Sequence, residues 1–318
     1  MTTLSNTFGV AARNFTAYPE MPSAKELVEY GVWVEELGYD SVWVWDHMLL
    51  GVDPNFPIID SLTVLTGIAA RTKRLKMGTG ILVLTLRNPV TLAKQLSSMD
   101  QLSEGRMIMG MAAGWYRREF EAVGVPFEKR GKIMDENLEI MNRLWTEEKV
   151  TGQYMNHNLS NAVMYPKPYQ TPRMPLLIGG YVDKALQRAA TTGDGWLTYF
   201  YKPDDFKRSW DKIRGFAKDA GKDPDSLLNA AQLPIMVGPS KEAVQDDMMD
   251  WLNKEWDFPA NSDCSRDSAI MGSVDDCVAQ LREHMAAGVQ KIIFVPYKYQ
   301  RDQVETIARE IIPRLKAL

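Results

Sequence analysis

The residue with the clearest capacity for chemistry is His47, which ends the apolar run SVWVWDH at residues 41–47. The chain has three histidines, and the other two, His157 and His284, lie in an irregular stretch and inside a predicted helix. An imidazole has an ordinary pKa of about 6.5, so it can accept or donate a proton near neutral pH. We predict that His47 is a general acid or base and that the neighbouring Asp46 takes part in catalysis. The alternative is a hydrogen-bonded histidine at the rim of the fold, without a catalytic role.

Small residues stand where three other apolar runs end or bend, and they indicate a cofactor that carries phosphate. Glycines and alanines let a backbone approach a ligand closely, and a glycine-rich turn before a helix offers free N–H groups to an anion. A glycine inside a strand marks a bulge or a close approach, although a plain bend of the strand explains Gly80 equally well. The predicted cofactor-binding residues are Gly80, Ile81, Ala112, Ala113, Gly114, Gly179, Gly180 and Tyr181.

Aromatic side chains gather near the ends of the same runs, with few fixed charges among them. The residues predicted to line a substrate pocket are Trp45, Trp115, Trp196, Tyr199 and Tyr297. Aromatic surfaces offer area and stacking rather than ionic partners, so we expect a neutral, largely apolar organic substrate. Arg13 and Lys202 are the charged exceptions near run ends, and solvated side chains are the simpler interpretation of both.

An alternation of short apolar runs and longer stretches with helical period positions these residues. The runs predicted as strands are Thr7–Asn14, Ser41–His47, Leu75–Leu84, Arg106–Ala113, Pro175–Gly179, Gly195–Phe200, Leu228–Val237 and Lys291–Pro296. The predicted helices are Ser23–Leu37, Ile59–Thr72, Pro89–Leu102, Glu119–Trp145, Asp183–Thr191, Pro203–Ala220, Lys241–Trp256, Val274–Ala287 and Asp302–Leu315. The long stretch Glu119–Trp145 is expected to bend near Gly124 and Pro126. Right-handed crossovers favour an α/β fold that closes into a single-domain (β/α)8 TIM barrel over residues 1–318, with its chemistry at the carboxyl ends of the strands. No GxGxxG turn follows the first strand, which disfavours the open doubly wound sheet.

Two stretches interrupt this rhythm. Residues Glu147–Arg173 are rich in turn formers and proline, and residues Asp257–Gly272 are polar and irregular. Both follow helices, so we expect extra loop at the closed face of the barrel. The first stretch has a second interpretation, in which it forms a small hairpin or contacts a partner.

Charge and composition exclude several classes of function. The net charge is −4, and no block of Lys and Arg could follow a phosphate backbone, so we expect no nucleic-acid partner. No segment approaches the roughly 20 apolar residues of a membrane span, so we expect a cytoplasmic protein. The two cysteines, Cys264 and Cys277, lack metal-ligand spacing and are predicted to be free thiols. No HExxH, GxSxG or Walker A motif supports a metal or a serine nucleophile.

The whole chain resembles the bacterial luciferase-like monooxygenase family of flavin- and deazaflavin-dependent (F420) enzymes. The segments that carry the resemblance are GYDSVWVWDHM (Gly38–Met48), MGTGILVLTLRNPVTLAKQLSSMDQLSEGRMIMGMAAGW (Met77–Trp115), PLLIGGY (Pro175–Tyr181) and GDGW (Gly193–Trp196). The resemblance implies a TIM barrel with an insertion around the fifth strand and a shorter one after the seventh. It also implies a reduced flavin or F420 at the carboxyl ends of the strands, an active-site histidine at His47, and a non-prolyl cis peptide at Gly80–Ile81.

The sequence also departs from some members of this family. Where F420-dependent sugar-phosphate dehydrogenases have a glutamate after the fourth strand, this chain has Trp115, which argues against that substrate. Where bacterial luciferase has an arginine on the phosphate, this chain has Ala113, so we expect phosphate contacts mainly from the backbone.

Three functions are compatible with these features. The favoured one is a monooxygenase that uses O₂ and reduced FMN supplied by a separate flavin reductase. Similar use of Lys and Arg argues slightly against a GC-rich source, in which F420 is common, and so for FMN. The first alternative is an F420-dependent oxidoreductase acting on an alcohol or an activated alkene, and the second is a non-catalytic flavin-binding relative. A homodimer is the family expectation.

Overall fold

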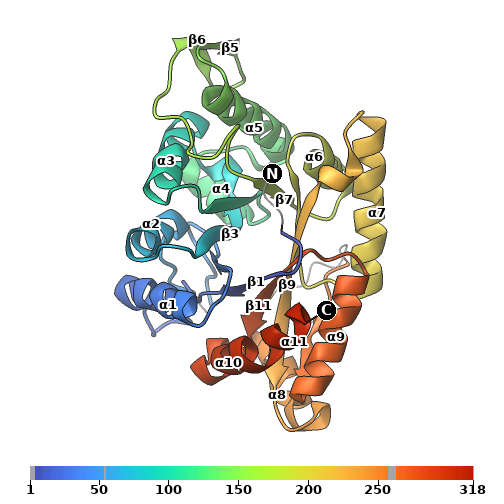
Figure 1. Cartoon of the computed structure of the whole chain (residues 1–318). Helices are drawn as coiled ribbons and strands as arrows, with labels where there is room; N and C mark the ends of the chain where they lie inside the picture. Colours follow the sequence, from blue (N-terminus) through green and yellow to red (C-terminus); the bar gives the residue numbers. More distant parts are fainter. Residues whose placement is uncertain (1–3, 54, 257–262, 318) are drawn as a thin grey trace. The chain divides into compact units, whose positions relative to one another are not determined.

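The computed structural model describes residues 4–53, 55–256 and 263–317 of the chain, in which strands and helices alternate (Figure 1). The chain divides into two compact units. We call Met1–Ala12, Trp33–Trp43 and Leu177–Leu318 the first unit, and Arg13–Val32 and Val44–Leu176 the second unit.

Parallel strands form the frame of the first unit. They are β1 (Thr7–Ala11), β2 (Ser41–Val44), β7 (Leu176–Gly179), β8 (Gly195–Tyr199), β9 (Leu228–Val237), β10 (Ile270–Gly272) and β11 (Lys291–Pro296). Hydrogen bonding gives the order β7-β8-β9-β11-β1-β2, with β10 added to the far end of β9 through the pair Ile270–Ile235. All six residues of β11 are buried, as expected for a parallel strand covered on both faces. The helices of this unit are α6 (Asp183–Thr191), α7 (Pro203–Asp219), α8 (Lys241–Glu255), α9 (Val274–Ala286), α10 (Arg301–Thr306) and α11 (Ile312–Lys316).

The second unit holds the elements nearest to His47. Strand β3 (Lys76–Val83) pairs in parallel with β4 (Met107–Ala112). The helices are α2 (Ser61–Arg71), α3 (Pro89–Leu102), α4 (Arg117–Val123) and α5 (Arg130–Thr146), while α1 (Ala24–Glu36) belongs partly to each unit. Side-chain caps start two of these helices, because Asp60 accepts a hydrogen bond from the backbone N–H of Thr63 and Asn88 accepts one from that of Val90.

The parallel sheet closes, since β9 pairs with β8 on one side and with β11 on the other. All eight predicted strands belong to it in βα order, so the predicted (β/α)8 barrel is confirmed. The ninth strand, β10, lies in the predicted loop Asp257–Gly272 and was missed, because three residues carry no period that can be recognised. Residues 257–262 of that stretch lie outside the described part of the chain.

Two other stretches can be compared closely with the prediction. The helical stretch expected over Glu119–Trp145, with a bend near Gly124 and Pro126, is two helices, because Gly124 adopts a left-handed conformation (φ 72°) that ends α4. The stretch Glu147–Arg173 contains the antiparallel hairpin of β5 (Val150–Gln153) and β6 (Asn158–Ala162), which confirms the hairpin interpretation over the plain loop.

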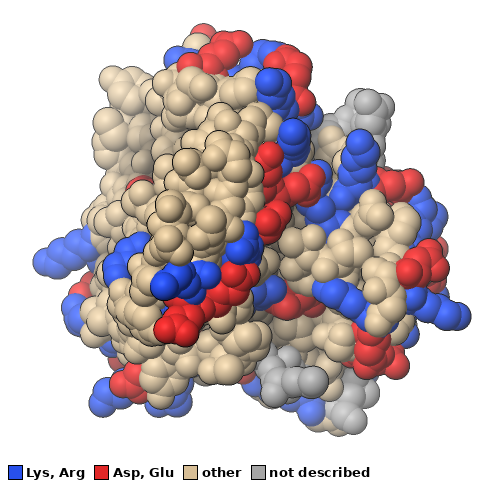
Figure 2. All heavy atoms as spheres, turned by 90° about the horizontal axis from the view of Figure 1, so that it is seen from above, with Lys and Arg blue, Asp and Glu red and all other residues tan. Residues whose placement is uncertain are grey.

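The surface and the thiols agree with the composition. Figure 2 shows Lys, Arg, Asp and Glu side chains interspersed on the face it presents, without a block of one sign. In the described part of the chain, Cys264 and Cys277 form no disulfide. Among the described residues, there is no candidate for a bilayer-spanning helix of sufficient length and hydropathy.

Candidate active site

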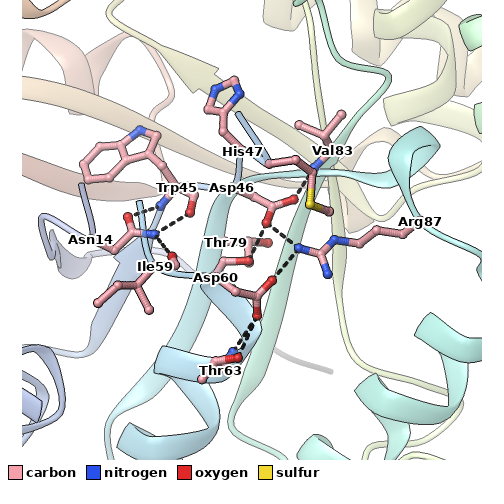
Figure 3. A network of polar contacts seen from close by, with 12 residues as sticks. Asn14, Trp45, Asp46, His47, Ile59, Asp60, Thr63, Thr79, Val83 and Arg87 are labelled. Carbon is pink, nitrogen blue, oxygen red and sulfur yellow. Dashed lines mark hydrogen bonds and ion pairs between the residues drawn. The ribbon is translucent and has the colours of Figure 1, made fainter. Parts of the chain in front are cut away.

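The backbone that leads into His47 is fixed by Asn14. Strand β2 ends at Val44, so His47 stands three residues beyond the strand rather than at its last position. The Asn14 amide accepts a hydrogen bond from the backbone N–H of Trp45 (3.1 Å) and donates to the carbonyl oxygens of Trp45 and Ile59, each at 2.8 Å (Figure 3). All three contacts are local to the second unit, and they fix the chain just before the histidine.

The chain at and after His47 is held by Glu119. The His47 Nδ1 lies 2.9 Å from Glu119 Oε2, and the other carboxylate oxygen accepts hydrogen bonds from the backbone N–H groups of Met48 and Leu49. Glu119 lies on α4 and only 1% of its side chain is exposed, whereas 15% of the His47 side chain is exposed. The prediction included Glu119 only as the start of a helix, and its role was missed.

The charge on Glu119 determines which nitrogen of His47 is available. Burial raises the pKa of the Glu119 carboxyl. The hydrogen bond to His47, the charge of that imidazole and the two backbone amides together lower the pKa by more than burial raises it, so the net pKa is below its ordinary value. An ionised carboxylate can only accept hydrogen bonds, which assigns the proton of a neutral His47 to Nδ1. Nε2 then carries the lone pair, on a ring that is partly open to a ligand.

Asp46 was predicted to assist His47, and the structure places it elsewhere. Figure 3 shows the imidazole of His47 pointing away from the Asp46 carboxylate. Asp46 is buried and accepts hydrogen bonds from Ser61 Oγ (2.8 Å), the backbone N–H of Val83 (3.0 Å) and Arg87 Nη2 (2.7 Å). The reason is the two-residue period of extended chain, which turns neighbouring side chains to opposite faces.

Arg87 connects Asp46 with a second carboxylate. Its Nη2 also donates to Asp60 Oδ2 at 2.8 Å, and Asp60 is the cap of α2. Burial lowers the pKa of the Arg87 guanidinium, but the charges and hydrogen bonds of Asp46 and Asp60 raise it above its ordinary value. Burial likewise raises the pKa of the Asp60 carboxyl, and its bonds to Arg87 and Thr63 bring the net pKa below the ordinary value.

The predicted cofactor residues in the second unit lie on strands β3 and β4 and in the segment that follows β4. The pairing of β3 with β4 shifts register between Thr79 and Leu82, so Gly80 and Ile81 form the predicted irregularity. Their peptide bond is trans, since the cis bonds of the described chain all precede prolines; the expected cis peptide is therefore corrected.

The segment after β4 is equally confined. Ala112 is the last residue of β4, and the carbonyl oxygen of Ala113 accepts a hydrogen bond from Thr85 Oγ1 at 2.7 Å. Gly114 has a φ of 79°, and a Cβ there would lie 2.5 Å from Val83 Cγ1. A side chain is thus excluded at Gly114 by both conformation and space.

The other predicted cofactor residues belong to the first unit. Gly179 ends β7, and Gly180 has a φ of 127°, with its carbonyl oxygen accepting a hydrogen bond from Trp196 Nε1 at 3.0 Å. A Cβ on Gly180 would lie 2.7 Å from the Cβ of Ala185 on α6. Tyr181, before that helix, is 38% exposed.

The predicted substrate aromatics divide into buried and exposed side chains. Trp196 is 1% exposed and stacks on Phe206, and Tyr297 is 5% exposed and packs edge-on against Trp251, so both are core residues rather than a pocket lining. Large aromatic side chains near strand ends bury more surface when they pack under helices, which sequence position does not reveal.

The remaining predicted aromatics are Trp45, Tyr199 and Trp115. Trp45 is 9% exposed and packs edge-on against Phe15, while the Tyr199 ring stacks on Phe200. Trp115 is 57% exposed, with its ring centroid 6.2 Å from that of His47.

Apolar side chains that sequence reasoning overlooked also flank His47. Met48 and Leu49 are 36% and 42% exposed, and their backbone N–H groups are the ones held by Glu119. The sequence feature that could have identified Met48 and Leu49 is their position directly after His47.

The other histidines and charges do not join this site. His284 is 2% exposed on α9, and burial lowers its pKa to about 4. The carbonyl oxygen of His157 accepts a hydrogen bond from the backbone of Tyr154 within the hairpin. Arg13 lies over the ring of Phe15, and Lys202 lies 3.7 Å from Asp205. Among the described residues, no group of His, Cys, Asp and Glu is arranged to hold a metal ion.

Comparison with known proteins relates this chain to a family of oxidoreductases. A family model described as luciferase-like monooxygenase matches residues 7–291. An F420-dependent glucose-6-phosphate dehydrogenase from Amycolatopsis mediterranei (strain U-32) is 27% identical, over 96% of this chain and 98% of that protein.

Two solved structures are similar in fold. An F420-dependent secondary alcohol dehydrogenase, solved with an F420–acetone adduct, superposes with a TM-score of 0.81 over 99% of each chain, at 21% identity. The oxygenating constituent of 3,6-diketocamphane monooxygenase from Pseudomonas putida, a type II Baeyer–Villiger monooxygenase in complex with FMN, has a TM-score of 0.78 over 99% of each chain, at 17% identity.

Proposed function

We propose, since the chain belongs to the luciferase-like monooxygenase family, that this oxidoreductase uses F420 to interconvert a largely apolar alcohol and its carbonyl compound. The observation that carries the proposal is the pair of His47 and Glu119, in which a buried carboxylate lies 2.9 Å from Nδ1 and leaves Nε2 as a proton acceptor. This proposal replaces the FMN monooxygenase favoured from the sequence.

The pair suits alcohol oxidation because that reaction needs a base. Breaking the C–H bond of an alcohol releases a hydride, and the hydroxyl proton must leave as the carbonyl forms. Nε2 of His47 would accept that proton, and the ionised Glu119 would stabilise the resulting imidazolium through Nδ1–H. In the reverse direction the same nitrogen would return the proton to the carbonyl oxygen.

The cofactor is proposed from the relatives and from the fit of the backbone. F420, when bound, supplies a carbon that accepts or donates the hydride. The register shift at Gly80–Ile81 would let the backbone of the second unit meet a flat ring system closely. In the first unit, Gly179, Gly180 and Tyr181 precede α6, whose amino end would hold a phosphate through backbone N–H groups.

The substrate class follows from what surrounds His47. Trp115, Met48 and Leu49 are exposed apolar side chains beside the imidazole, and they would bind an alkyl or aryl group. Trp115 also occupies the position at which the F420-dependent sugar-phosphate enzymes have a glutamate. We therefore expect turnover of apolar secondary alcohols and none of glucose 6-phosphate.

An FMN-dependent monooxygenase remains the second candidate. The similarity over the full chain to the FMN-bound monooxygenase supports it. In that reaction a separate reductase would supply reduced FMN, and His47 would move a proton beside the bound flavin.

One titration separates the two candidates. Purified protein is titrated with F420, FMN and reduced FMN, and turnover is then followed by F420 absorbance with aliphatic and cyclic secondary alcohols. Tight binding of F420 with alcohol-dependent reduction is expected. Binding of reduced FMN alone, with oxygen consumption in the presence of a flavin reductase, would instead establish the monooxygenase.

A further inference from the structure

The cation Arg87 lies between two carboxylates next to the catalytic pair, yet the proposed reaction gives it no role. Its side chain is 14% exposed, and its Nη2 bonds to Asp46 at 2.7 Å and to Asp60 at 2.8 Å (Figure 3). The Asp46 side chain is 1% exposed, while that of Asp60 is 40% exposed. Arg87 is thus the cation that compensates the buried charge of Asp46.

Asp46 in turn connects the ends of two strands and the start of a helix. It immediately precedes His47, and its carboxylate accepts hydrogen bonds from the backbone N–H of Val83, the last residue of β3, and from Ser61, the first residue of α2. Both carboxylate oxygens are therefore occupied by donors, Oδ1 by Ser61 and Arg87 and Oδ2 by the backbone N–H of Val83.

The chain around His47 is consequently held on both sides. Asn14 binds the backbone of Trp45 and the network of Arg87 binds Asp46, whereas Glu119 binds Met48 and Leu49. With its neighbours held, the imidazole has little freedom to leave Glu119.

We propose that Arg87 is a positioning residue for His47: by holding the Asp46 carboxylate in place on Val83, it keeps His47 Nδ1 in register with Glu119. The inference rests on the proposed function for its kinetic consequence. Without Arg87, the buried Asp46 carboxylate loses the cation that compensates its charge, and its bonds to Val83 and Ser61 weaken as the side chain shifts. His47 then moves relative to Glu119 and to the substrate, and displacement on the scale of 1 Å costs up to about 100-fold in rate.

The test compares Arg87→Met, Arg87→Lys and the double variant Arg87→Met/Asp46→Asn. Arg71→Met is the matched control, because Arg71 also makes an ion pair of 3.0 Å in the second unit, with Glu29, but is 54% exposed and makes none of the contacts of Asp46 described above. Each protein is examined by long-range ¹H–¹⁵N spectra of ¹⁵N-labelled histidine, which reports the tautomer without any cofactor or substrate. The chain has three histidines, so the spectrum contains few signals, and the signal that disappears in His47→Gln is that of His47.

We expect one tautomer of His47, with the proton on Nδ1, in the wild type and in Arg71→Met. Arg87→Met should mix the tautomers and lower kcat by about 10- to 100-fold, with the KM for the alcohol changed less than threefold. Arg87→Lys, and the double variant that removes the buried charge, should recover part of both. If Arg87→Met does not fold, the comparison of Arg87→Lys and the double variant with the wild type still applies.

Two results would overturn the inference. One is an unchanged His47 signal in Arg87→Met with only the melting temperature lowered. The other is that neither Arg87→Lys nor Arg87→Met/Asp46→Asn recovers any of the single tautomer or of kcat. A protein that shows the expected tautomer changes but oxidises no alcohol would contradict the proposed function and leave the positioning role of Arg87 intact.

Discussion

Replacing Glu119 by glutamine tests the catalytic pair with the smallest change of shape. In the wild type the carboxylate accepts hydrogen bonds from His47 Nδ1 and from the backbone of Met48 and Leu49. The amide oxygen of a glutamine can keep the two backbone contacts, which leaves its NH₂ group facing His47. Nδ1 must then accept, so the proton moves to Nε2 and the base is lost.

The expected loss is large at the active site and small in stability. A catalytic histidine held in the wrong tautomer loses about 10² to 10⁴ in kcat, or about 3–5 kcal/mol of transition-state stabilisation. The free energy of unfolding should change by only about 1–2 kcal/mol, because a buried hydrogen-bonded charge is replaced by a hydrogen-bonded amide. His47→Ala should lower turnover by at least about 10²-fold and leave cofactor binding intact, and it provides the reference for complete loss of the base.

The assay is steady-state oxidation of the best alcohol at pH 7, with cofactor affinity and melting temperature measured in parallel. Glu128→Gln is the control, since Glu128 is an exposed glutamate paired with Arg117. Since the folded-state pKa of Glu119 is below its ordinary value, its carboxylate stabilises the fold at neutral pH. That stabilisation disappears as the pH falls through the folded-state pKa, and the glutamine variant should lack this acid loss. A Glu119→Gln enzyme with kcat within threefold of wild type would refute the reasoning.

Other perturbations should give equally specific results. Gly180→Val should weaken cofactor binding and also lower the melting temperature, because the residue has φ 127° and its Cβ would lie 2.7 Å from that of Ala185. Gly215→Ala is the control for both measurements, because a Cβ there meets open space. His284 has a folded-state pKa of about 4 against 6.5, so the unfolded chain takes up the proton first and stability should fall by about 3 kcal/mol between pH 6.5 and 4. Urea titrations at several pH values should find this slope reduced in His284→Gln, and an equal slope would count against it. Trp115→Ala should raise the KM of apolar alcohols about tenfold with kcat nearly unchanged; steady-state kinetics that show the opposite split would give Trp115 a role in the chemical step.

The elements of this protein could be predicted well because their signals are local. The boundaries of α3 at Pro89–Leu102 and of β9 at Leu228–Val237 agree with the sequence analysis. Apolar period, a capping asparagine and a following turn are properties of neighbouring residues, so they can be seen without a fold. An element without such signals was missed, as the three residues of β10 show, whereas the glycine and proline at 124 and 126 marked the break after α4.

The partners of the candidate site were harder to predict. The sequence places Asp46 beside His47, yet the carboxylate that meets the imidazole comes from Glu119, 72 residues away. Proximity along an extended chain is misleading, since adjacent side chains point to opposite faces. Trp196 and Tyr297 were misplaced for a related reason, because the same aromatic residue type suits a pocket or a core.

The sequence by itself determined the closed βα architecture and placed His47 close to the carboxyl end of the second strand. Both follow from patterns a few residues long, whose burial preference depends little on what covers them. Only the tertiary structure decided that Glu119 orients His47, that Arg87 compensates Asp46, and that Trp115 stays exposed beside the imidazole. Hydrogen bonds and ion pairs depend on distances of a few tenths of an ångström between distant segments, and those distances exist only once the chain has packed.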